Sequence, residues 1–79
     1  MMTPEELTNV AAALRLTAEK MIEMGKDGPV AKVSVGVTNA LVHAAKEMKK
    51  ENPLIASIDP GPTLMWSEVL TIACIIQGA

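Results

Sequence analysis

The segment from Ala31 to Met48 decides between two fold classes, because its apolar residues fit both a strand and a helix. Residues 31–38 alternate apolar and polar side chains, as a β-strand with one buried face does. The stretch 54–58 is the one partner for such a strand, and the two would give an α+β fold with a two-stranded βαβ unit. Two strands are marginally stable alone, so this alternative requires a second copy of the chain to extend the sheet.

The same segment also has apolar residues at helical spacing, namely Val30, Val33, Val37, Leu41, Ala44 and Met48. Polar residues, Asn39 and Lys46 among them, lie on the opposite side. Small residues recur every four positions, and these are Gly36, Ala40 and Ala44. Such a ridge lets a neighbouring helix approach closely but serves no purpose in a strand. A helix also satisfies its own backbone hydrogen bonds, so we favour an all-α fold.

The clearest helix signal lies near the N-terminus, in the sequence TPEEL. It places Thr3 as the N-cap, Pro4 at the first helical position and Glu6 as the partner in a capping box. Apolar residues then recur every seven positions, at Leu7, Leu14 and Met21. Gly25 is a typical helix stop, so the spacing predicts a helix over 4–24.

Proline and glycine place the boundaries of the second helix. Pro29 suits the first turn of a helix, with Asp27 or Gly28 as its cap. The residue before a proline is disfavoured in helical conformation, so this helix ends before Pro53. The predicted span is 29–51.

A third helix is predicted over 63–77, after an ordered but irregular connection through 54–58. This helix has apolar residues on nearly every side, which is typical of a helix buried on every side. Two short neighbouring helices would cover it only in part, so we expect a homo-oligomer, most simply a dimer. The residues expected at that interface are Trp66, Ile72, Ile75 and Ile76. The expected architecture is a single helical domain over 1–79, either a small three-helix bundle or a helical hairpin plus a C-terminal apolar helix.

Residues with catalytic chemistry are few. The chain has one histidine, His43, and one cysteine, Cys74, and no motif pairs them as base and nucleophile. One of each is too few for a structural zinc site, and the glycines do not follow a phosphate-loop or dinucleotide-binding pattern. We therefore predict a protein that is not an enzyme, without a catalytic residue, a metal site or a cofactor.

The net charge and the apolar content limit the classes of partner. Nine acidic and seven basic residues give a net charge of −2, which lacks the basic excess of nucleic-acid-binding proteins. The longest apolar run is too short to cross a bilayer and contains Glu68, so no membrane partner is expected. With a single cysteine and no charged-then-apolar leader, the expected compartment is the cytoplasm.

Two modes of binding are consistent with these patterns. The apolar surplus favours a homo-oligomer that binds another protein, as small regulators and inhibitors of bacteria and their phages do. The alternative is an oligomer that binds or sequesters an anionic, nucleotide-like small molecule. It rests on the sequence GKDGPVAK, in which Lys26, Gly28 and Lys32 surround an expected helix N-terminus, and such N-termini attract anions.

Overall fold

The computed structural model describes residues 3–48 and 51–78. Its elements are, in chain order, α1 (Pro4–Glu23), the 3₁₀ turn η1 (Lys32–Ser34), α2 (Val35–Met48), α3 (Pro53–Ala56) and α4 (Trp66–Gly78). No strand occurs in these two stretches, so the all-α class is confirmed and the two-stranded alternative is wrong. Its proposed strand 31–38 is occupied by η1 and the start of α2, and its strand 54–58 overlaps α3.

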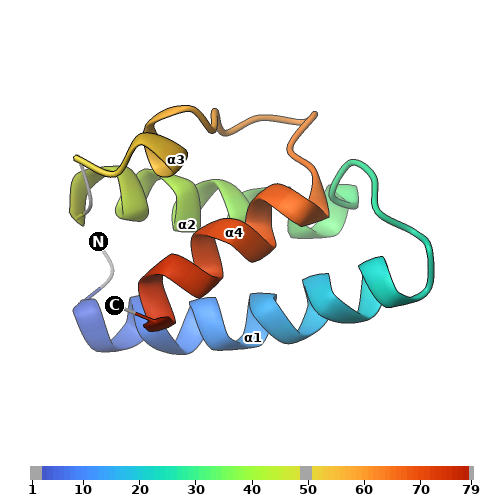
Figure 1. The fold of residues 1–79 in the computed structure, drawn as a ribbon, viewed down its shortest axis with the longest axis horizontal. Coiled ribbons are helices and arrows are strands. Elements are labelled where there is room, and N and C mark those ends of the chain that lie inside the picture. The colour runs from blue at the N-terminus through green and yellow to red at the C-terminus, as the bar shows by residue number, and fades with distance from the viewer. Residues whose placement is uncertain (1–2, 49–50, 79) are drawn as a thin grey trace.

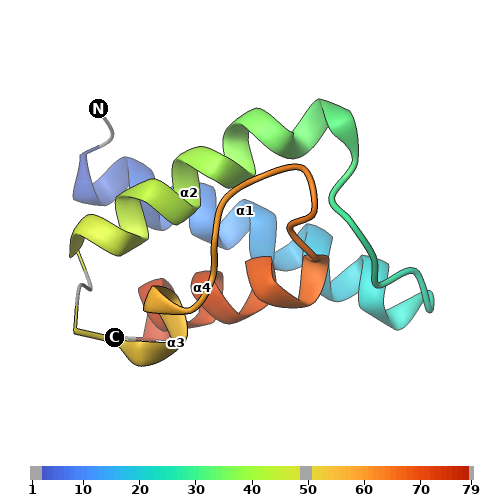
Figure 2. The ribbon, with the colours of Figure 1, turned by 90° about the horizontal axis from the view of Figure 1, so that it is seen from above.

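The helices form two layers. α1 lies along one side of the molecule, and α2 and α4 pack together on the other side (Figure 1). Seen from above, α2 and α4 run on either side of α1 (Figure 2). α4 packs along α1 much more extensively than α2 does, and α3 contacts both α2 and α4. The contact between α1 and α2 is therefore the smaller of the two helix contacts that α1 makes.

The N-terminal boundary of α1 is confirmed in detail. The Thr3 hydroxyl accepts a hydrogen bond from the Glu6 N–H at 3.1 Å, and the Glu6 carboxylate accepts one from the Thr3 N–H at 3.2 Å. Both halves of the predicted capping box are therefore present. The helix stops at Glu23, shortly before Gly25, whose φ is 71°. This left-handed conformation suits glycine and explains the stop.

Replacing Thr3 with alanine should lower the free energy of unfolding by about 1 kcal/mol, because the first turn of α1 loses its cap. Denaturant unfolding of the two proteins measures the difference. Thr17→Ala is the control, since Thr17 is exposed on the same helix and its hydroxyl donates to the Ala13 carbonyl oxygen. Alanine is the better helix former at such a position, so an equal loss in both variants would contradict the capping role.

The second helix begins later than predicted. Pro29 pairs with Met65 in an isolated β-bridge, and the Val30 N–H donates to the Leu64 carbonyl at 2.8 Å. Because the backbone here finds partners in a distant segment, the chain turns helical only at η1. The predicted start at Pro29 is therefore wrong. The predicted extension over 49–50 lies outside the described residues.

The turn before this bridge caps α4 rather than α2. The Asp27 carboxylate accepts a hydrogen bond from the Ser67 N–H at 3.1 Å, in the first turn of α4. The Glu68 carboxylate accepts another from the Met65 N–H at 2.9 Å. Both negative charges lie at the positive end of the helix dipole. The prediction that Asp27 caps the second helix is therefore wrong, and α4 begins at Trp66, slightly later than predicted.

All four α-helices contribute to one apolar core. Its helical members are Leu7, Ala11, Leu14 and Ala18 of α1, Leu41, Val42 and Ala45 of α2, Ile55 of α3, and Trp66, Val69, Ile72 and Ala73 of α4. The connection predicted to be irregular contains α3, which is capped by Asn52, whose side-chain oxygen accepts from the Leu54 N–H at 2.9 Å. Within this connection Ile55 and Ile58 are buried, whereas Leu54 is 57% exposed.

Candidate functional site

α2 has a buried face and an apolar stripe next to it. Four of its residues are buried: Thr38, Leu41, Val42 and Ala45. Beside this face, five residues of η1 and α2 follow one another at steps of three or four positions, and these are Val33, Val37, Ala40, Ala44 and Met48. We call these five residues the α2 stripe. Ala44 also packs against the core. Val33 is 94% exposed, Val37 42% and Met48 50%, while the two alanines between them are partly buried.

The position of this stripe differs from the one that the sequence predicted. The helical pattern placed Val33, Val37 and Leu41 together on one apolar face, with the polar residues opposite. In the structure only Leu41 of these three lies in the core, so the single apolar face is wrong. The result is a row of large apolar side chains on the surface, and such rows in small proteins mark interaction sites.

The connection between α3 and α4 explains why the buried face of α2 differs from the predicted one. The Asn39 side-chain oxygen accepts a hydrogen bond from the Gly61 N–H at 3.0 Å. The Lys46 ammonium lies 3.5 Å from the Asp59 carboxylate. The segment 57–65 therefore covers the side of α2 that the sequence predicted to face solvent. The α2 stripe, on the other side, is left exposed.

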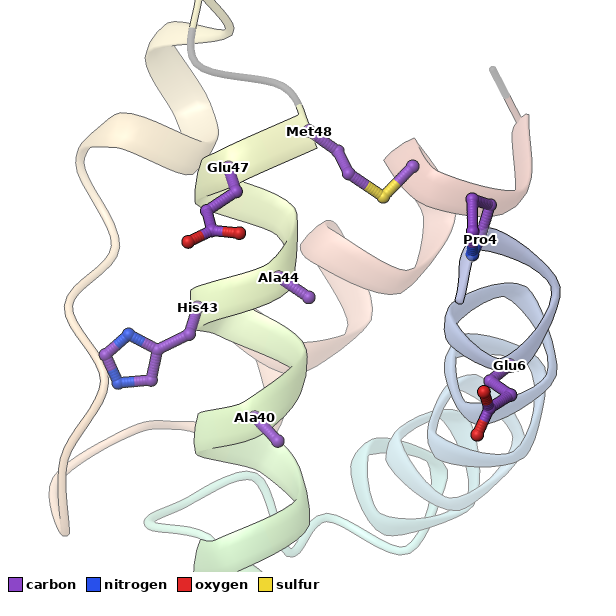
Figure 3. Close-up of a pocket in the computed structure, with 7 residues that line it drawn as sticks. All are labelled: Pro4, Glu6, Ala40, His43, Ala44, Glu47 and Met48. Atoms are coloured by element: carbon purple, nitrogen blue, oxygen red, sulfur yellow. The ribbon is translucent and has the colours of Figure 1, made fainter. Parts of the chain in front are cut away.

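A groove lies between α2 and the start of α1. Its lining residues are Pro4 and Glu6 of α1 and Ala40, His43, Ala44, Glu47 and Met48 of α2. Ala40 and Ala44 point toward α1, and Met48 extends toward Pro4 (Figure 3). The His43 ring points away from α1, at the outer edge of the groove. The groove thus combines small apolar side chains and one thioether with polar groups at its edges.

Charged residues lie near both ends of the α2 stripe. Lys32 precedes Val33 at one end, while Glu47 and Glu6 line the groove with Met48 at the other. All three charged residues are exposed, and the ion pairs found within the described chain involve other residues. Met48 is followed in the sequence by Lys49 and Lys50, which lie outside the described residues, so charges of both signs occur near this end.

The residues predicted to bind an anion do not surround a helix N-terminus. Lys26 and Lys32 are exposed, and the helix start expected at Pro29, with Asp27 or Gly28 as its cap, is replaced by an isolated β-bridge. The Gly28 carbonyl accepts a hydrogen bond from the Trp66 N–H at 3.1 Å. The N-terminus of α4, which lies beside this segment, is capped by the Asp27 carboxylate. The helix start on which the anion-binding alternative was based is therefore absent, and the binding of an anion by Lys26, Gly28 and Lys32 stays a prediction.

The residues predicted at a homodimer interface belong to the core of the single chain. Trp66 is 3% exposed and Ile72 is fully buried. Ile75 and Ile76 are partly buried and pack against the same core. α1, α2 and α3 all contact α4, while Ile75 and Ile76 stay partly exposed. A role for these four residues in an interface stays a prediction.

The residues with reactive side chains lie on separate elements. His43 is exposed on α2, and Cys74 is half-buried on α4, near Arg15. The hydrogen bond to Glu19, at 2.7 Å, and the nearby Cys74 raise the pKa of Arg15, so its guanidinium stays charged. Within the described part of the chain, no three His, Cys, Asp or Glu side chains are grouped so as to hold a metal ion. The helices of that same part include none that is long and apolar enough to cross a membrane.

Comparisons of the chain with protein-family models, with curated proteins and with solved structures found no match. The α2 stripe and the groove beside it are therefore the features of this chain that bear on its function.

Proposed function

We propose that this chain is a small, non-enzymatic helical protein that self-associates and acts by binding another protein, as a regulator or inhibitor does. The observation that carries the proposal is the exposed α2 stripe. A large apolar side chain left in water forgoes about 1.5–3 kcal/mol of burial. Val33, Val37 and Met48 together therefore favour a partner that presents its own apolar surface.

The shape of the stripe supports a protein partner over a small molecule. Fifteen helical steps separate its two ends, which corresponds to about 22 Å along the axis. An amphipathic helix binds such a groove through apolar side chains spaced three or four residues apart. A small polar metabolite would gain little from valine, alanine and methionine side chains.

A photo-crosslinking amino acid at position 37 tests the proposal in cells that produce the chain. We expect discrete protein adducts at this position, identified by mass spectrometry. The control is the same amino acid at position 16, because Leu16 is 70% exposed on α1, away from the buried face of that helix. The absence of protein adducts at position 37, or the same adducts at both positions, would contradict binding through the α2 stripe.

A further inference from the structure

We draw no further inference here: the strongest candidate, the groove between the start of α1 and the end of α2 with the exposed α2 stripe beside it, carries nothing beyond the proposed function, because nothing in the structure shows what covers it.

Discussion

Replacing Ile72 with alanine should lower the free energy of unfolding by about 2–5 kcal/mol. Ile72 is fully buried within α4, and alanine would leave a cavity in the core that the other helices fill only in part. A chain of this length has roughly 4–12 kcal/mol of stability in total, so the loss is a large fraction of it. Denaturant and thermal unfolding should show a much lower midpoint or an unfolded chain.

Two comparisons make this result specific to the core. Leu16→Ala removes a similar side chain from a position that is 70% exposed, and it should change stability by less than about 0.5 kcal/mol. The loss caused by Ile72→Ala should also be the same at low and high protein concentration, because its own chain buries Ile72. A loss that grows with concentration would show instead that Ile72 stabilises a homodimer, as the sequence first indicated.

α1 could be predicted almost residue by residue because its signals are local. The capping box lies within four consecutive residues, and the glycine that stops the helix, Gly25, lies two positions after its last residue, Glu23. The seven-residue apolar pattern identifies the buried face correctly for Leu7 and Leu14. Local patterns of this kind need no information about the rest of the chain.

The start of the second helix could not be predicted because its determinants are distant in sequence. Pro29 is equally suited to a helical first turn and to extended chain, since its ring fixes φ at a value compatible with both. Its pairing with Met65 decides between the two. A pattern read over neighbouring residues contains nothing about a segment on the other side of α2.

The buried face of α2 was misassigned for a related reason. Asn39 and Lys46 look like solvent-facing residues, but the connection before α4 covers them and satisfies their polar groups. α3 also contacts α4, and of the exposed large apolar side chains Val33, Val37 and Met48 lie on η1 and α2 while none lies on α4. The small residues of the ridge were the one sequence signal for the exposed stripe. Their spacing indicated a close helix contact without identifying the partner.

A pair of substitutions in α2 tests which of its faces is buried. Leu41→Ala should lower the free energy of unfolding by about 2–5 kcal/mol, because Leu41 is fully buried among the residues of the core. Val37→Ala should cost less than about 1 kcal/mol in dilute solution, because Val37 is 42% exposed. The sequence pattern alone would place both residues on one face and predict large losses for both.

The dependence of stability on protein concentration distinguishes a side chain buried within one chain, Leu41, from one on the exposed stripe, Val37. The loss from Leu41→Ala should not depend on concentration, since the side chain is buried within one chain. Stability gained through a dimer rises with concentration, because only the folded chain binds its partner. Under the proposed self-association through the α2 stripe, Val37→Ala should therefore have a small effect in dilute solution and a larger one at high protein concentration. Denaturant unfolding at two concentrations measures both effects. A large loss from Val37→Ala in dilute solution would mean that the α2 stripe faces the core.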